Sequence, residues 1–257
     1  MKLPEFLCTS PARLGELTER IGAASAGRFT RTRPHGVLIA RIAAIGAGVL
    51  EPVSGSAIPV RGRLAVFAER ADDGSATRTA RAARAPYLAA CVLGRASPGA
   101  GEPVEVLSAY AHPCASERHL MLVDSDLERQ TLAQLRSVQA WLGSRKGLRV
   151  VIEKPLFDIG PDDTGVREAV PRPPCIPDFM VRATTADGAP ARVVIVETMG
   201  FADEAYRARK RHTLALMRAA LAGATVVVHD FHEPRGVLQS WRARRFWDDL
   251  RCALTER

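Results

Sequence analysis

Two acidic residues interrupt apolar stretches in the second half of the chain. Asp178 follows Pro177 in the run CIPDFMVRATT, and Glu197 lies at the end of the run ARVVIVET. Each run is typical of a strand, and the turn sequence DGAP between them predicts a hairpin that would place the two acids side by side. Two desolvated carboxylates repel each other unless a proton or a cation compensates their charge. Together they indicate a site for a hard divalent cation such as Mg²⁺, whereas either acid alone could simply accept hydrogen bonds at the rim of a sheet.

The elements that must position these acids follow an α/β order. Residues 124–147 predict a helix with an apolar stripe, and residues 148–159, 175–185 and 191–198 predict three strands. A second helix over 202–223, a fourth strand over 224–231 and a closing helix over 236–254 complete the pattern. The order of helix, three strands, helix, strand and helix predicts a small mixed sheet with helices on its faces.

Residues 1–118 are expected to form a separate, smaller α+β region. The run SPARLGELTERIG predicts a helix with Ser10 as its N-cap, and AIPVRGRLAVFAER, PYLAACVLGR and PVEVLSAYAHP predict strands. The polar, basic run DDGSATRTARAARAP between them predicts either a helix or a loop. This region offers no recognisable chemistry, so we assign the chemistry to residues 119–257 and expect residues 1–118 to bind a substrate or a partner.

Composition favours a cytoplasmic protein without a membrane segment. The five cysteines are scattered and form no CxxC pair, which indicates reduced thiols. The most apolar stretch, residues 36–50, is short and is interrupted by Arg41. The net charge is +8, but only four of the 36 basic residues are lysine. Such an excess of arginine is typical of GC-rich coding, so the basic charge alone is weak support for nucleic-acid binding.

The motif residues resemble those of a known superfamily of nucleases. Pro177-Asp178 on the second strand and Glu197-Thr198-Met199 on the third, within this order of elements, resemble the PD-(D/E)XK superfamily with its restriction-endonuclease-like fold. The resemblance covers roughly residues 120–257. It implies hydrolysis of phosphodiester bonds in DNA that depends on Mg²⁺ (or Mn²⁺), with Asp178 and Glu197 as catalytic metal ligands. More faintly, the runs VDSDLER, PDF and VETMG resemble proteins of plasmids and conjugative elements, which implies protein partners from such a mobile-element system.

The chain departs from the superfamily pattern at Met199, where the E-x-K motif has a lysine. Residues i and i+2 of a strand share a face, so the motif lysine would point toward the metal beside Glu197. We predict that Lys210, on the helix that follows, replaces this lysine, with Tyr206 one turn earlier on the same face. Lys154 on the first strand is the second candidate.

The resemblance also suggests a third metal ligand and a DNA contact. Glu128 corresponds to an acid of the first helix that many such nucleases use as an extra ligand, although an acid in a first turn is also favoured by the helix dipole. Glu153 competes for the same role. Arginines of the last two helices could hold phosphates without reading sequence, or could be ordinary surface residues: Arg207, Arg211, Arg242, Arg244 and Arg245.

Two alternatives stay open on the sequence alone. Met199 favours a protein that kept the fold, lost catalysis and serves as a DNA-binding or assembly component of a mobile element. A metal-free α/β interaction module is the other alternative, and it requires Asp178 and Glu197 to lie apart.

Overall fold

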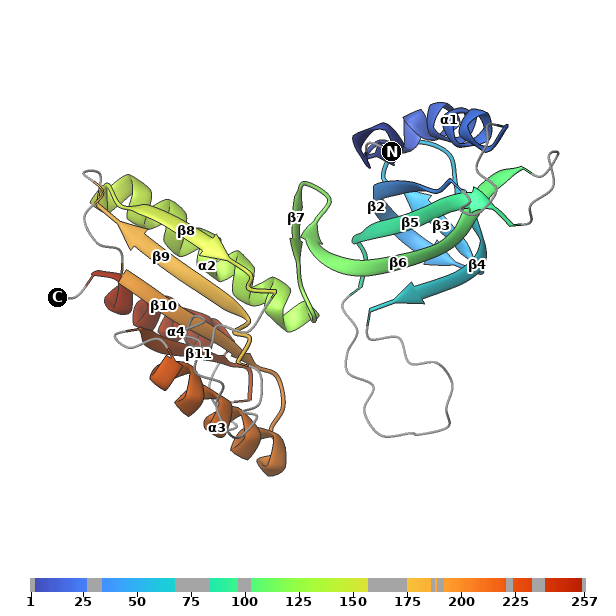
Figure 1. Ribbon diagram of the computed structural model, residues 1–257. Helices are drawn as coiled ribbons and strands as arrows, with labels where there is room; N and C mark the ends of the chain where they lie inside the picture. The colour runs from blue at the N-terminus through green and yellow to red at the C-terminus, as the bar shows by residue number, and fades with distance from the viewer. Residues whose placement is uncertain are drawn as a thin grey trace, which may run out of the picture. The chain divides into compact units, whose positions relative to one another are not determined.

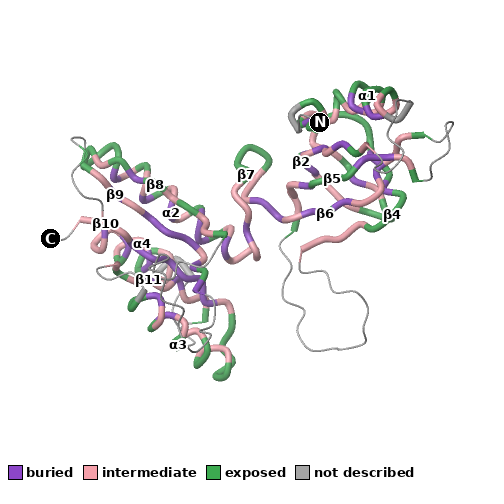
Figure 2. Tube along the Cα trace, viewed as in Figure 1, coloured by how far each residue is buried: buried purple, intermediate pink, exposed green. Residues whose placement is uncertain are grey.

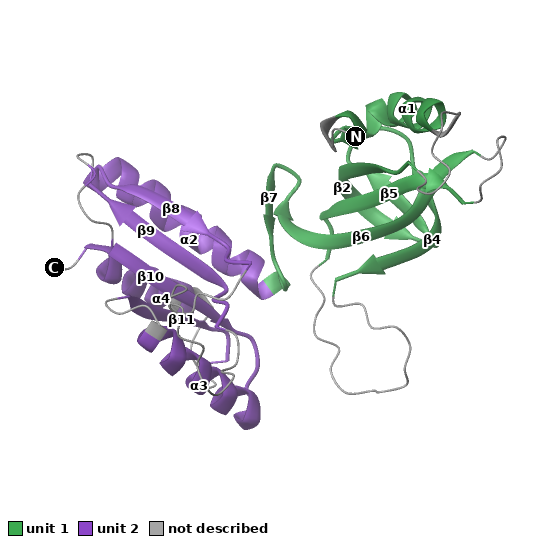
Figure 3. Ribbon diagram, in the orientation of Figure 1, with its two compact units in different colours: residues 1–126 green, residues 127–257 purple. Residues whose placement is uncertain are grey.

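The computed structural model describes residues 3–26, 34–67, 84–96, 103–156, 175–185, 188, 192–220, 224–232 and 239–255. The chain divides into two compact units, Met1–Asp126 and Leu127–Arg257, which Figure 3 colours separately. The predicted boundary after residue 118 falls inside a hairpin whose two strands pair with each other in the first unit. The division therefore comes slightly later than expected, where the long helix of the second unit begins.

The first unit is a barrel with a short helix (Figure 1). Its elements are η1 (Leu3–Phe6), β1 (Leu7–Cys8), η2 (Pro11–Arg13), α1 (Leu14–Ala26), β2 (Gly36–Gly46), β3 (Val49–Pro52), β4 (Ile58–Val66), β5 (Tyr87–Arg95), β6 (Val104–Ser116) and β7 (His119–Leu122). Five strands follow one another in the order β2-β3-β4-β6-β5, and β5 pairs back onto β2, which closes the ring. The pair β4–β6 is parallel and the other pairs of the ring are antiparallel. A small five-stranded Greek-key barrel is the architecture of the OB-fold.

The barrel forms because its strands bury alternate side chains. In β2 the residues 36, 38, 40 and 42 are buried while their neighbours are not, and Leu17 and Ile21 of α1 join the same core. At Gly62 the register of β4 against β6 shifts, and a Cβ there would lie 2.0 Å from the carbonyl oxygen of Leu107. Only glycine therefore fits where these two backbones approach.

The strands and the helix predicted for this unit are present, with small differences. The strands predicted around residues 58–66, 87–95 and 104–113 are present as β4, β5 and β6. The predicted helix is present as η2 and α1, but the Ser10 side chain makes no capping hydrogen bond. The run 72–86 lies largely outside the described residues. The apolar stretch 36–50 forms β2 and the turn into β3, and none of the helices in the described ranges is long and apolar enough to cross a membrane.

The second unit has the predicted order of elements. It consists of α2 (Asp126–Lys146), β8 (Arg149–Glu153), β9 (Phe179–Thr184), β10 (Arg192–Met199), α3 (Glu204–Ala220), β11 (Thr225–Asp230) and α4 (Gln239–Thr255). The sheet order is β11-β10-β9-β8, with β10 and β11 parallel and the other neighbours antiparallel. The α/β fold with a small mixed sheet is thus confirmed. Residues 157–174 and most of the predicted turn DGAP lie outside the described residues.

Helices cover both faces of this sheet. On one face, His229 of β11 contacts Thr131 of α2 and stacks on Phe246 of α4. On the other face, Ile195 of β10 packs with Leu214 of α3. Residues 194–199 of β10 are all buried, as Figure 2 shows along the strand. A polar side chain on β10 is therefore enclosed by a helix, whichever face it points to.

Candidate active site

Asp178 and Glu197 lie next to each other at one end of the antiparallel pair β9–β10. Phe179 pairs with Val196, so the two acids occupy the next position along the hairpin. The backbone N–H of Asp178 donates to Glu197 Oε1 at 3.0 Å, and the backbone N–H of Thr198 donates to Asp178 Oδ2 at 2.7 Å. Each carboxylate is thus held by the backbone of the neighbouring strand. The metal-free interaction module required the acids to lie apart, and they do not.

Lys210 of α3 reaches both acids. Its ammonium donates a hydrogen bond to Glu197 Oε2 and lies 3.9 Å from Asp178 Oδ2. Glu197 points toward α3 because it shares a strand face with Ile195, which packs on that helix. The side chains of Glu197, Asp178 and Lys210 are 2%, 15% and 24% exposed, so the cluster is mostly shielded but reachable from solvent at Lys210.

The electrostatics of this cluster indicate a deficit of positive charge. Burial, followed by the charge of Asp178, raises the pKa of Glu197 to about 7, although Lys210 acts in the opposite direction. Burial alone would lower the pKa of Lys210, but the charges of Asp178 and Glu197 outweigh it and raise that pKa above its usual value. One lysine therefore compensates two carboxylates only in part, and a proton or a second cation is needed to complete the balance.

Tyr206 lies beside the cluster, one turn before Lys210. Its ring meets the ring of Phe201 edge-on, with 5.1 Å between the centroids. Burial raises the pKa of Tyr206, and the Lys210 charge partly opposes this. The first turn of α3 is fixed by Asp203, whose Oδ1 accepts the backbone N–H of Tyr206 at 2.9 Å. The predicted proximity of Tyr206 to Lys210 and the two acids is thus present.

Met199 occupies the position of the motif lysine and is 7% exposed. It pairs with Asp230 of β11, and Arg207 of α3 donates two hydrogen bonds to that carboxylate, at 2.9 and 3.1 Å. The ammonium that accompanies Glu197 therefore comes from the helix and not from the strand.

Lys154, the second candidate for the displaced lysine, belongs to another ion pair. Its Nζ lies 2.6 Å from Glu128 Oε2, and both side chains are less than 10% exposed. The ammonium also lies 5.5 Å from the centroid of the Phe179 ring. Since Phe179 and Asp178 are consecutive, they point to opposite faces, and Lys154 therefore lies across the sheet from the Asp178 carboxylate.

Neither candidate for a third metal ligand joins the two acids. Glu128 is held by Lys154, and Glu153 is hydrogen-bonded to the exposed Arg182 at 3.0 Å. Within the described ranges, no three His, Cys, Asp or Glu side chains are grouped so as to hold a metal ion. Glu128 as a ligand beside Asp178 and Glu197 is therefore not supported, because its helix covers the other face of the sheet.

A buried polar network behind the site was missed by the sequence reasoning. Thr198 Oγ1 donates to Thr131 Oγ1 at 3.1 Å, and Thr131 Oγ1 lies 2.9 Å from His229 Nδ1. Burial lowers the pKa of His229 to about 4, so the imidazole is neutral at pH 7. The network anchors Thr198, whose N–H holds Asp178. Its only sequence signal is a polar residue inside each of the apolar runs VIVET and VVVHD.

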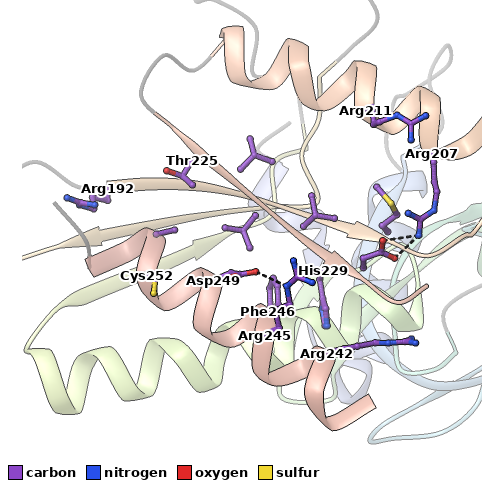
Figure 4. Close-up of a pocket in the computed structure, with 16 residues that line it drawn as sticks. Arg192, Arg207, Arg211, Thr225, His229, Arg242, Arg245, Phe246, Asp249 and Cys252 are labelled. Carbon is purple, nitrogen blue, oxygen red and sulfur yellow. Dashed lines mark hydrogen bonds and ion pairs between the residues drawn. The ribbon is translucent and has the colours of Figure 1, made fainter. Parts of the chain in front are cut away.

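Arg207 and Arg211 line a groove of about 780 Å³ that follows β11 between α3 and α4 (Figure 4). Its charged lining residues are Arg192, Arg207, Arg211, Arg242, Arg245, Asp230 and Asp249. Positive charge predominates in this lining. Arg211 is also paired with Glu204 at 2.5 Å, and both side chains are largely exposed. Met199 and Asp230 line the same groove, which therefore begins beside the end of the strand that carries Glu197.

Comparison with known proteins places the second unit in a family. The model of the restriction endonuclease-like C-terminal domain matches residues 124–253. The chain is also 43% identical over 107 residues to an "Uncharacterized protein in cib 5'region" of Escherichia coli, a match that covers 40% of this chain and 47% of that protein. The chain thus spans about half the length of the curated relative that it matches. No solved structure matches it. Since the matched region covers half of the sequence and runs from α2 to α4, the chain belongs to the restriction endonuclease-like C-terminal domain family, within the PD-(D/E)XK nuclease superfamily.

Proposed function

We propose that the second unit is a metal-dependent nuclease that hydrolyses phosphodiester bonds of DNA. Asp178 and Glu197 are the metal ligands, and Lys210 is the catalytic lysine. The convergence of both carboxylates on the Lys210 ammonium carries this proposal. Membership of a restriction endonuclease-like family supports a nuclease-type function.

The two carboxylates fit Mg²⁺ or Mn²⁺. Mg²⁺ is commonly bound through one or two carboxylates, with waters and substrate phosphate oxygens at its other positions. The raised pKa of Glu197 supports the fit, because a dication beside this carboxylate would relieve the repulsion from Asp178. A metal ion bound there would polarise the phosphate and lower the pKa of a bound water.

The side chains around the pair have separate roles in this proposal. Lys210 stabilises negative charge that develops on the phosphate, and its hydrogen bond to Glu197 fixes where the ammonium stands. Tyr206 positions Lys210 from the same helix face. The backbone N–H groups of Asp178 and Thr198 keep the two carboxylates oriented without extra side chains.

DNA is held by phosphate contacts in the groove along β11. Five arginines against two aspartates give this groove a positive charge, which favours a polyanion without reading base sequence. Arg207 and Arg211 are the contacts nearest to Lys210 along α3.

The second candidate function is a catalytically inactive DNA-binding or assembly component of a mobile element. The observation in its favour is Met199, a buried apolar side chain where the superfamily has its lysine. Such a component would keep the fold and the groove but would not cleave DNA.

Cleavage assays separate the two candidates. The wild type is incubated with single-stranded DNA, duplex DNA and RNA in Mg²⁺ or Mn²⁺, beside Glu197→Ala and Lys210→Ala. Glu153→Ala and Lys146→Ala are matched controls, since both residues are exposed and lie on the same unit. We expect cleavage that both site variants abolish and both controls retain. Cleavage that survives Glu197→Ala would refute the site, and DNA binding without cleavage would favour the inactive component.

A further inference from the structure

The outer surface of the barrel presents an uncovered aromatic side chain. Tyr110 on β6 is 46% exposed. Its neighbours across the two adjacent strands are Ala90 on β5 and Ala65 on β4. Both neighbours are too small to bury a phenol ring that stands on the sheet, which agrees with the exposure of nearly half of Tyr110.

Apolar and aromatic side chains extend this surface on both sides of Tyr110. In the row toward one end of the strands, the exposed Val92 lies opposite Ser108. In the row toward the other end, His112 lies on β6 with its ring 6.2 Å from that of Tyr110. The Phe67 ring lies next to the His112 ring, with 4.1 Å between the centroids and a tilt of 32° between the planes. The surface is thus a strip of flat and apolar groups about three rows long.

Arginines border the strip. Arg63 on β4 is exposed and pairs with Ser108, in the row next to Tyr110. Arg41 on β2 is exposed in the row of His112, and its guanidinium donates to the carbonyl oxygen of Glu117 at 3.0 Å. The combination of an uncovered ring and flanking guanidinium groups matches the two needs of a single nucleic-acid strand, a stacking surface for a base and positive charge for its phosphates.

We propose that this outer face of the barrel binds single-stranded nucleic acid, with a base stacked on Tyr110 and phosphates held by Arg63 and Arg41. The site lies in the first unit and shares no residue with the Asp178–Glu197 cluster, so it goes beyond the proposed nuclease activity and does not depend on it. Small barrels of this architecture can bind oligonucleotides on the face of their second and third strands, which here are β3 and β4, whereas the strip is centred on β6 and includes β4 only through Ala65 and Arg63. The side chains on the strip, rather than the architecture, carry the assignment.

Other occupants fit the surface less well. A second copy of the chain would bring its own Arg63 and Arg41 against the same residues. The second copy would have to offer acids on this face to balance those charges. The acids beside the strip are already in ion pairs, Glu105 with Arg61 at 2.5 Å and Asp124 with His112 at 3.4 Å. In duplex DNA the bases stack on each other and cannot lie on Tyr110, so an unpaired strand is favoured.

The test measures the binding of fluorescent oligothymidylate to the full chain in EDTA, where no metal-dependent cleavage occurs. Tyr110→Ala removes the stacking surface for one base and should therefore weaken binding about 5- to 150-fold. Tyr110→Phe keeps the ring and should bind like the wild type. Leu7→Ala is the matched control, since Leu7 is a similarly exposed apolar residue on β1. It should leave the affinity unchanged.

Salt dependence gives a second measurement that does not rely on Tyr110. Arg63→Gln should reduce the slope of log affinity against log salt by about 0.7, the value for one phosphate contact in a single strand. Arg13→Gln, an exposed arginine on η2, should not change the slope.

Three results would overturn the proposal. The first is an unchanged affinity in both Tyr110→Ala and Arg63→Gln. The second is equal binding of duplex and single strand, with equal sensitivity to these variants. The third is self-association in sedimentation velocity that Tyr110→Ala abolishes while oligothymidylate binding persists, which would assign the face to a second copy. None of these results bears on cleavage at Glu197, so failure here and failure of the nuclease proposal are distinguishable.

Discussion

Replacement of Glu197 by glutamine should change how the stability of the second unit depends on pH. In the wild type, burial and Asp178 raise the pKa of this carboxyl from 4.5 to about 7. A carboxyl with a raised pKa binds its proton more tightly in the folded state. Its contribution to stability is therefore full below pH 4.5 and is lost as pH rises through about 7. Glutamine does not ionise, so Glu197→Gln does not lose stability as the pH rises through 7.

The magnitude follows from the shift. Each pKa unit corresponds to about 1.4 kcal/mol, so the whole shift from 4.5 to about 7 is worth about 3.4 kcal/mol of unfolding free energy. At pH 5 the unfolded carboxyl has already lost most of its proton, so about 2.5 kcal/mol of this is lost between pH 5 and pH 8. Glutamine also turns its NH2 group, which cannot accept a hydrogen bond, toward either Lys210 or the Asp178 N–H, but that cost is the same at both pH values. The quantity to measure is the unfolding free energy of Glu197→Gln minus that of the wild type. This difference should rise by about 2.5 kcal/mol from pH 5 to pH 8.

Urea unfolding of both proteins at pH 5 and pH 8 in EDTA measures this quantity, with near-ultraviolet circular dichroism as the probe of tertiary structure. Asp249→Asn is a control for an exposed carboxylate and should behave like the wild type. Mg²⁺ at pH 8 should stabilise the wild type and not Glu197→Gln, because only the carboxylate is a good ligand. Parallel pH profiles for Glu197→Gln and the wild type would refute the claim that Glu197 is a strained, desolvated acid.

The remaining predictions concern the groups around this acid. Burial lowers the pKa of His229 to about 4, so its contribution to stability is present above pH 6.5 and is lost as pH falls through 4. The wild type should therefore lose about 3 kcal/mol of unfolding free energy between pH 7 and pH 4, and His229→Phe should not lose it, as measured by urea unfolding. Lys210→Met leaves two buried carboxylates without their cation, and should cost about 3 kcal/mol at pH 8 in EDTA, with a larger stabilisation by Mg²⁺ than in the wild type. Lys154→Met should cost about 3–5 kcal/mol because Glu128 stays buried and unpaired, whereas the double variant Lys154→Met/Glu128→Gln should recover most of that loss in the same measurement.

The sequence was sufficient to predict the second unit because its signals are local. Strands there are apolar runs between polar turns, and the helices carry apolar stripes at helical spacing. Asp178 and Glu197 were detectable as charged residues inside such runs, where an uncompensated carboxylate is costly. Lys210 was detectable because lysine is rare in this chain and because Lys210 lies four residues after Tyr206, on the same face of the helix.

The remaining features depend on pairings that a single sequence does not encode locally. The closure of β2 onto β5 joins segments about fifty residues apart, so the sequence of residues 1–118 predicts an α+β region but not a closed barrel. The pairing of Glu128 with Lys154 depends on which face of the sheet α2 covers, and local patterns do not fix that face. The Thr131–His229 contact requires the same knowledge, since it joins residues 98 positions apart in the sequence.

The groove along β11 also affects whether this edge of the sheet can pair with a strand of another molecule. Among the described strands, β11 pairs only with β10, so its outer edge carries backbone groups without a strand partner, on a run of valines. Such an edge is prone to pair with the same edge of another molecule, which leads to aggregation. Arg192, Arg207, Arg211, Arg242 and Arg245 surround this edge. Two such edges would bring ten guanidinium groups together, so these arginines protect the protein from edge-to-edge association, whether or not a phosphate backbone lies in the groove.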